Sequence, residues 1–263
     1  ALALNLLQGD GYLGVAGGFG TDTAAGLMGE ADVVLVAGAS LSPFTMRFGH
    51  LLGPDSTVIQ IDAALQPTHP RVDTFVSADV KSAVGRILKT LDGPASPGAR
   101  PAGAWRAEAR KRLADGPAHH PGSAETPDGR LDPRSLATAL DAVLPERRTV
   151  VQDGGHFVGW APMYWNIPRP QDLVMVGTAY QAIGLGLASA VGAARAVEDG
   201  RTLVLASGDG GFLMGLSDLE SLIGAASSAV VVIYNDAAYG AEIHQYGSQG
   251  LTDLELFEVF PGY

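Results

Sequence analysis

The chain has 263 residues, of which 28 are acidic and 17 basic, so its formal net charge at pH 7 is −11. This charge argues against nucleic acid and anionic membranes as partners, because both are negatively charged themselves. The sequence contains no cysteine, which excludes disulfide bonds, thiolate catalysis and cysteine-ligated zinc. It shows no signal peptide, and no apolar run approaches the roughly 20 residues that span a bilayer. We therefore expect a cytoplasmic protein.

The first part of the chain alternates short apolar runs with one amphipathic segment. Residues 32–37, 57–62 and 74–77 predict three strands, the first of them of the buried type. Residues 78–91 place apolar side chains at helical spacing and predict a helix. We interpret residues 1–93 as a Rossmann-like α/β domain that is incomplete in this sequence.

A stretch rich in proline and glycine follows. Residues 93–103 carry three prolines and three glycines, which is typical of a linker. A charged helix is predicted over residues 104–114, and residues 116–129 again resemble a loop. We therefore place a linker at residues 94–130.

The second half begins with a helix start signal. Asp132 at the N-cap and Pro133 at the first helical position predict a helix that runs to about Leu144. From Thr149 onward strands and helices alternate, so we expect a second α/β domain over residues 131–263, truncated at its C-terminus. The predicted fold class is α/β, with two domains that each contain a mainly parallel sheet flanked by helices.

Two short motifs near the C-terminus are placed at the ends of predicted strands. Residues 201–206 and 229–234 predict buried strands, joined by a helix over residues 212–226. Such a crossover is right-handed and makes the two strands parallel. If the strands are neighbours, their carboxyl ends lie about 5 Å apart. Asp209 and Asp236 would then lie side by side, at the edge where open α/β sheets bind ligands.

The glycines beside Asp209 suit a phosphate. Gly210 and Gly211 let a phosphate approach the backbone, and the helix that follows directs its positive end toward it. Each motif alone is also common as a simple turn or loop start. Their combination after two matching strands favours a site where two carboxylates share one divalent metal ion.

These residues resemble the signature of thiamine diphosphate enzymes, which is Gly-Asp-Gly followed some two dozen residues later by Asn-Asn or Asn-Asp. Residues 208–211 and 235–240 match its two halves. Residues 178–186 resemble the glycine-rich turn that holds the aminopyrimidine of the cofactor, and residues 153–161 resemble the segment that touches its diphosphate. The resemblance is to the acetolactate synthase and 2-oxo-acid decarboxylase group, whose middle domain is similar to the residues before 95.

The resemblance implies a Mg²⁺ site and a set of cofactor contacts. Asp209 would bind the metal through its side chain, Asp236 would stand where the family usually has asparagine, and Ala238 would contribute its backbone carbonyl. Ile183 matches the bulky residue that holds the cofactor in a bent shape, although a plain core position is the alternative, and the Gln181 carbonyl would face the amino group. The other implied cofactor contacts are His156, Phe157, Gly208, Gly210, Gly211, Tyr239 and Gly240.

The histidines have competing interpretations. His156 could donate a hydrogen bond to the diphosphate or be a local structural residue, and Phe157 departs from the polar residue that is frequent in the family, which leaves only a backbone contact there. His244 lies where the family lines its substrate channel, but a solvated surface position is equally compatible. We interpret His119 and His120 as surface residues.

We predict no FAD in this protein. Residues 17–20 are glycine-rich but follow no clear strand, so they are a weak nucleotide-binding signal. Some relatives hold FAD in the middle domain, near residues 38–40 of this sequence. Residues 40–47 depart from the stretch with acidic residues and arginine that the FAD-binding members have.

The resemblance implies decarboxylation and/or carboligation of a small-molecule 2-oxo acid, acetolactate synthase-like, by a homodimer or homotetramer with thiamine diphosphate and Mg²⁺. The catalytic glutamate of the family lies on an N-terminal pyrimidine-binding domain that is absent from this sequence. We therefore expect no catalytic residue in this chain and no activity from it alone. One alternative is a non-catalytic relative that binds the cofactor. Another is a Rossmann-type nucleotide-binding oxidoreductase, although no segment supplies both its glycine motif and its acidic residue.

Overall fold

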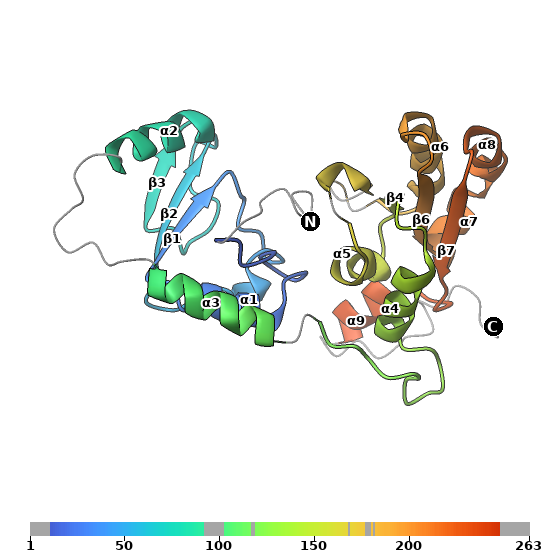
Figure 1. Ribbon diagram of the computed structural model, residues 1–263, viewed down its shortest axis with the longest axis horizontal. Helices are drawn as coiled ribbons and strands as arrows, with labels where there is room; N and C mark the ends of the chain where they lie inside the picture. The colour runs from blue at the N-terminus through green and yellow to red at the C-terminus, as the bar shows by residue number, and fades with distance from the viewer. Residues whose placement is uncertain are drawn as a thin grey trace. The chain divides into compact units, whose positions relative to one another are not determined.

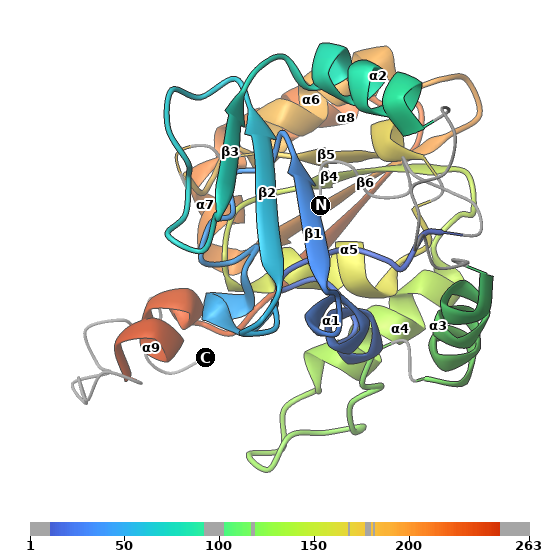
Figure 2. The ribbon, with the colours of Figure 1, turned by 90° about the vertical axis from the view of Figure 1, so that its left-hand side faces the viewer.

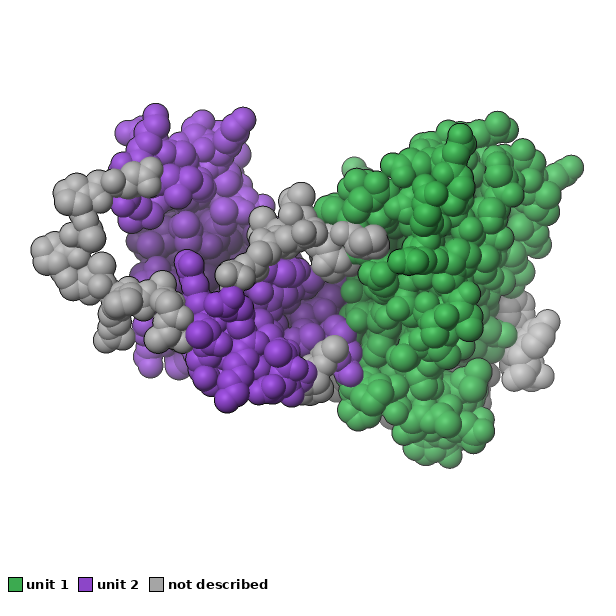
Figure 3. Space-filling view, viewed as in Figure 1, with its two compact units in different colours: residues 1–7, 120–263 green, residues 8–119 purple. Residues whose placement is uncertain are grey.

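The computed structural model describes residues 11–91, 103–116, 119–167, 169–176, 180 and 182–247. The chain forms two compact units, which divide between His119 and His120 (Figure 3). This division falls inside the stretch 94–130 that the sequence suggests as a linker. In the residues that the structure describes, no helix is both long enough and apolar enough to cross a membrane.

The first unit contains a three-stranded parallel sheet in the order β1-β2-β3 (Figure 1). Its strands and helices are α1 (Asp22–Gly29), β1 (Val33–Ala37), the 3-10 turn η1 (Arg47–Gly49), β2 (Thr57–Asp62), β3 (Thr74–Ser77), α2 (Val80–Leu91) and α3 (Gly103–Asp115). Figure 2 views this sheet with its three strands side by side, α2 near one end and α1 near the other. Arg112 of α3 donates two hydrogen bonds of 2.7 Å to Glu30, which follows α1. The predicted strands and helices of this unit are confirmed.

The prediction that residues 32–37 form a buried strand is wrong in one respect. The strand exists, but the side chains of Val33 and Leu35 are 58% and 48% exposed in this chain. The physical reason is that only the opposite face of β1 packs in the core, where Val36 lies in one cluster with Val58. Apolar composition predicted the strand correctly but could not say which faces are covered.

The second unit contains a four-stranded parallel sheet in the order β5-β4-β6-β7. Its strands are β4 (Arg148–Gln152), β5 (Leu173–Met175), β6 (Thr202–Gly208) and β7 (Ala229–Tyr234), and its longer helices are α4 (Pro133–Val143), α6 (Gly186–Ala196) and α9 (Gly240–Gly247). The shorter elements are η2 (His156–Gly159), α5 (Trp160–Tyr164), η3 (Pro170–Asp172), α7 (Asp209–Met214), η4 (Leu216–Asp218) and α8 (Leu219–Ala225). The predicted α/β fold with two parallel sheets flanked by helices is confirmed. The prediction that residues 229–234 form a buried strand is wrong in its burial, because no residue of β7 is fully buried in this chain.

The connection between β6 and β7 differs from the single helix predicted over residues 212–226. It begins earlier, at Asp209, and is divided into α7, η4 and α8. The division lies at Gly215, whose N–H still donates to the Gly211 carbonyl at 3.3 Å. A Cβ at this position would lie 3.1 Å from the carbonyl oxygen of Gly184. The break therefore coincides with tertiary packing against this neighbouring turn. The apolar periodicity of residues 212–226 does not predict it.

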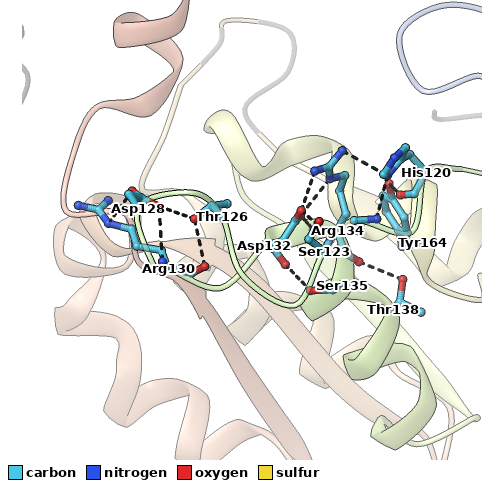
Figure 4. Close-up of polar contacts among 11 residues, drawn as sticks. His120, Ser123, Thr126, Asp128, Arg130, Asp132, Arg134, Ser135, Thr138 and Tyr164 are labelled. Atoms are coloured by element: carbon cyan, nitrogen blue, oxygen red, sulfur yellow. Dashed lines mark hydrogen bonds and ion pairs between the residues drawn. The ribbon is translucent and has the colours of Figure 1, made fainter.

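The start of α4 is fixed by the predicted N-cap. The buried carboxylate of Asp132 accepts hydrogen bonds from the N–H groups of Arg134 at 2.9 Å and Ser123 at 3.0 Å (Figure 4). It also forms an ion pair of 2.6 Å with the Arg134 guanidinium. These interactions, the one with the Arg134 side chain first, hold the pKa of Asp132 well below its usual range.

This network predicts a pH-dependent stability. Asp132→Ala should lower the free energy of unfolding more than Asp132→Asn, because asparagine is still a good N-cap whereas alanine is not. The folded-state pKa is depressed, so the advantage of wild type over Asp132→Asn should be complete above the unfolded pKa of about 3.9 and disappear as the pH falls through the folded value. Urea unfolding at a series of pH values measures this. A difference that does not change on acidification would contradict it.

Candidate cofactor and metal site

The parallel pairing of β6 and β7 brings the two predicted metal ligands to one edge of the sheet. Gly208, at the end of β6, is opposite Tyr234, at the end of β7. Asp209 follows the first of these residues directly, and Asp236 lies two residues after the second. The Oδ2 atom of Asp209 is buried, and no hydrogen-bond partner for it exists among the described residues.

The electrostatics of Asp236 show that the two carboxylates influence each other. Burial raises the pKa of Asp236, and the negative charge of Asp209 raises it further. The N–H of Ala238, which donates to Oδ1 of Asp236 at 3.2 Å, and the nearby His156 act in the opposite direction. Two carboxylates at a partly buried edge repel each other, and a shared cation removes that cost.

The turn that carries Asp236 is held by its own side chains. The N–H of Ala237 donates to Oδ1 of Asn235 at 3.1 Å, and Ala237 adopts a left-handed conformation with φ 55°. Ala238 uses its N–H within this turn, which leaves its carbonyl oxygen as the atom for the predicted metal contact. Across the described part of the chain, no three His, Cys, Asp or Glu side chains cluster closely enough to hold a metal. Two carboxylates and one backbone oxygen would suit a hard cation that takes further ligands from phosphate and water.

Gly240, the first residue of α9, lies in direct contact with the carboxylate of Asp236. A Cβ at position 240 would overlap Oδ2 of Asp236 and would lie 2.9 Å from Nδ1 of His156. The structure therefore brings together three predicted site residues that are up to 84 positions apart in the sequence (240 minus 156). Only a residue without a side chain permits this approach.

His156 and His244 were separate candidates in the sequence, and the fold places them together. Their ring centroids lie 4.4 Å apart. Burial lowers the pKa of His156, and the neighbouring His244 lowers it further, whereas Asp236 and Glu242 oppose the shift. The lowered pKa favours the neutral form of the His156 ring, which offers one donor and one acceptor beside the turn of Asp236.

The Phe157 side chain packs inside the protein. The ring is buried and stacks on Tyr234, with centroids 5.6 Å apart and an interplanar angle of 14°. A Cβ at Gly208 would lie 3.1 Å from this ring. Phe157 therefore supports the ends of β6 and β7. The Tyr234 hydroxyl is buried with no hydrogen-bond partner among the described residues, and burial raises its pKa.

Two of the predicted glycines differ in their surroundings. No atom lies within 4 Å of a Cβ built at Gly210, so this glycine faces open space. A Cβ at Gly211 would lie 2.7 Å from Oδ2 of Asp153, so its small size is required by the protein itself. Gly210 is therefore the position of this turn that is open to a ligand. Tyr239 is also partly exposed, close to the turn of Asp236 in sequence.

The turn that contains Ile183 lies against the end of β4. The Ile183 side chain is 36% exposed, and its Cγ2 lies 3.3 Å from a Cβ built at Gly154. Gly184 has φ +82°, and a Cβ there would lie 2.8 Å from Cβ of Met214. Both features hold the turn close to β4 and α7. Gln181, predicted to face the cofactor, lies outside the described residues.

The sequence interpretation missed two residues at this site. Arg130, in the loop before α4, donates from Nη1 to the carbonyl oxygen of Asp236 at 3.4 Å. The Nε atom of Arg130 lies 3.5 Å from Oδ2 of Asp128 (Figure 4). Asp153, at the end of β4, is fully buried and accepts three hydrogen bonds. Its position before two glycines at a strand end repeats the context of Asp209, which is the signal that could have identified it.

The segment that contains this site matches a known protein family. Residues 153–255 match the family model described as thiamine pyrophosphate enzyme, C-terminal TPP binding domain. This segment is a thiamine pyrophosphate-binding domain. The matched range contains Asp209 and Asp236, the turn of Ile183 and the segment that begins at Asp153. The resemblance seen in the sequence is thereby confirmed. The domain implies thiamine diphosphate as its cofactor, and thiamine pyrophosphate is another name for the same molecule.

The similarity to known proteins extends beyond this segment. The acetolactate synthase of Bacillus subtilis (strain 168) is 28% identical over 258 residues, which are 95% of this chain and 44% of that protein. The 2-hydroxyacyl-CoA lyase 2 of Bos taurus is 27% identical over 217 residues, or 80% of this chain and 33% of that protein. The chain therefore spans less than half of the length of these relatives.

A solved structure shows the same fold. The thiamine diphosphate-dependent 4-hydroxybenzoylformate decarboxylase of Rhodococcus jostii RHA1 superposes with a TM-score of 0.61 at 20% sequence identity. The match covers 91% of this chain and 42% of that chain.

The contact at Gly240 yields a prediction for the TPP-binding domain. Gly240→Ala should displace the Asp236 carboxylate or the His156 ring and weaken the Mg²⁺-dependent binding of thiamine diphosphate by about tenfold or more, which is about 1.4 kcal/mol. Calorimetric titration measures the affinity. The matched control is Gly224→Ala in α8, where a Cβ meets no atom within 4 Å. Equal losses in the two variants would contradict the assigned contact.

Proposed function

We propose that this chain is the cofactor-binding part of a thiamine diphosphate- and Mg²⁺-dependent enzyme that decarboxylates and/or carboligates a 2-oxo acid, acetolactate synthase-like. The main support is the buried Oδ2 of Asp209, which has no hydrogen-bond partner among the described residues and lies near Asp236, inside a segment that matches the TPP-binding domain. An oxygen donor set of this kind, at the carboxyl ends of parallel strands, fits a Mg²⁺ ion that bridges to a diphosphate.

Each predicted residue takes a definite role in this proposal. Asp209 and Asp236 would hold Mg²⁺ through carboxylate oxygens, and Ala238 through its carbonyl oxygen. Thiamine diphosphate, when bound, supplies the electron sink that a 2-oxo acid needs to lose CO₂. The backbone contacts to the diphosphate would come from Gly208, Gly210, Gly211, Tyr239 and Gly240.

Three further residues would orient the cofactor. Neutral His156 would donate one ring N–H to a diphosphate oxygen. The partly exposed Ile183 would support the bent cofactor, and the Gln181 carbonyl would face its amino group. Phe157 would act through its packing at the strand ends and through its backbone.

We do not propose any residue of this chain as the catalytic glutamate, which the resemblance assigns to a pyrimidine-binding domain. We propose a homodimer or homotetramer as the working assembly. Light scattering of the purified protein measures the assembly, and a monomer would contradict this part of the proposal.

The metal assignment is tested by removing one carboxylate. Asp209→Ala should abolish Mg²⁺-dependent binding of thiamine diphosphate, because the ion loses a charged ligand at a site that is partly buried. Asp199→Ala is the matched control, because it removes an exposed aspartate that follows α6. Calorimetry of both variants, with and without EDTA, measures the effect. Unchanged affinity in Asp209→Ala would reject the proposed metal site.

We also propose that the first unit binds no flavin tightly. Residues 40–47 depart from the stretch that FAD-binding members have. The separate glycine-rich loop at residues 17–20 is also filled by protein atoms, because the Gly18 N–H donates to the Phe44 carbonyl at 3.1 Å and a Cβ at Gly18 would overlap the Phe44 ring. The purified protein should therefore be colourless. A flavin absorbance band that survives gel filtration at one equivalent per chain would contradict this prediction.

Catalysis is tested by measuring CO₂ release from pyruvate and a panel of other 2-oxo acids, with Mg²⁺ and cofactor in excess. This chain alone should be inactive, and a protein that includes the pyrimidine-binding domain should be active, since general acid–base catalysis contributes typically 10²–10⁴-fold. Equal rates would mean that no glutamate outside this chain is needed. No activity in either protein would favour the alternative, a non-catalytic relative that binds the cofactor.

A further inference from the structure

We propose that Asp153 is a positioning residue that holds the turn of Ile183 in a fixed relation to the turn of Asp209. The inference rests on the proposed function, because these two turns would carry the ring end and the metal end of the cofactor. Asp153 lies at the end of β4, between the segments to which the two turns belong, and does not itself belong to the metal donor set.

The carboxylate of Asp153 is surrounded by donors from separate parts of the chain. Its Oδ1 accepts from the N–H of Gly154 at 2.8 Å. Its Oδ2 accepts from the N–H of Gly184, in the turn of Ile183, at 3.2 Å, and from the hydroxyl of Ser207, in β6, at 3.1 Å. One carboxylate therefore joins the end of β4, the turn before α6 and the end of β6.

The same carboxylate also fills the space between the turns. A Cβ at Gly186, the first residue of α6, would lie 3.0 Å from Oδ2 of Asp153, and a Cβ at Gly211 would lie 2.7 Å from the same atom. Gly211 comes two residues after Asp209. Movement of either turn toward the other is blocked by Asp153, and movement away from it breaks a hydrogen bond or opens a void.

The carboxyl group of Asp153 is satisfied by hydrogen-bond donors rather than by a cation. Asp153 is 0% exposed, and none of the ion pairs found in the described ranges includes it. Besides the three donors, the first turn of α6 favours a negative charge at its N-terminal end. A buried carboxylate without a cation is costly. We interpret this cost as the consequence of the role of Asp153 in holding the turns of Ile183 and Asp209.

Asp172 provides a matched comparison within the same unit. It is 2% exposed and therefore as deeply buried, but it is paired with Arg169 at 2.7 Å and Arg201 at 2.6 Å. It lies just before β5, at the amino ends of the strands, far along the sheet from the proposed site. Loss of its charge should affect folding without changing how a bound cofactor is placed.

The test uses Asp153→Asn in the full-length protein, with Asp172→Asn as control. An asparagine has nearly the same shape, but its amide hydrogens oppose the N–H donors that now face the carboxylate. Displacing a reacting group by about 1 Å can cost on the order of 100-fold in rate. We therefore expect thiamine diphosphate affinity within about tenfold of wild type, kcat about 100-fold lower with KM little changed, and an altered circular dichroism of the bound cofactor.

Hydrogen exchange supplies a readout that needs no cofactor. In the cofactor-free protein, Asp153→Asn should accelerate amide exchange at Gly184 and Gly211 relative to wild type, whereas Asp172→Asn should not. If Asp153→Asn fails to fold, Ser207→Ala is the second variant, because it removes one donor and leaves the charge in place. It should show the same exchange pattern with a smaller change in kcat.

The outcomes separate this inference from the proposed function. Unaltered exchange, circular dichroism and kcat in Asp153→Asn would overturn the positioning role while wild-type binding of the cofactor still stands. Parallel behaviour of the Asp153 and Asp172 variants would also overturn it, since both would then act through stability alone. A wild-type protein that binds no thiamine diphosphate with Mg²⁺ would overturn the proposed function, and the positioning role with it.

Discussion

The parallel pairing of β6 with β4 on one side and β7 on the other is the constraint on which the second unit depends. Because parallel strands end at the same edge, Asp153, Asp209 and Asp236 are collected there from three strand ends. Buried carboxylates must find donors or a cation. Asp153 accepts three hydrogen bonds within the chain, whereas Oδ2 of Asp209 has no hydrogen-bond partner among the described residues and would suit a metal ion.

The glycines around this edge follow from the same constraint. At Gly211 and Gly240 a side chain would meet the carboxylates of Asp153 and Asp236. At Gly184 the backbone is left-handed and lies against α7, which brings the turn of Ile183 to the sheet. Gly210 differs from these three glycines, because a side chain there would face open space. The glycines of the motif therefore serve two purposes, since most permit close packing of the protein and one leaves room for a ligand.

The sequence was sufficient for the features that depend on local pattern and on chain connectivity. Apolar runs gave the strands, Asp132 and Pro133 gave the start of α4, and the strand–helix–strand order placed Asp209 beside Asp236. The signature residues also led to the thiamine diphosphate family, because metal and diphosphate contacts come from short segments next to strand ends.

Other features depend on neighbours that are distant in sequence, and only the tertiary structure decided them. The break at Gly215 and the exposed face of β1 depend on what packs against each element. The pairing of His156 with His244 and the contact of Arg130 with Asp236 depend on loops that approach through space. The sequence by itself thus determined the strands at the site, the family and the two metal-ligand candidates. The tertiary structure decided how buried charges are satisfied, because burial and hydrogen bonding are properties of the folded arrangement and not of any local segment.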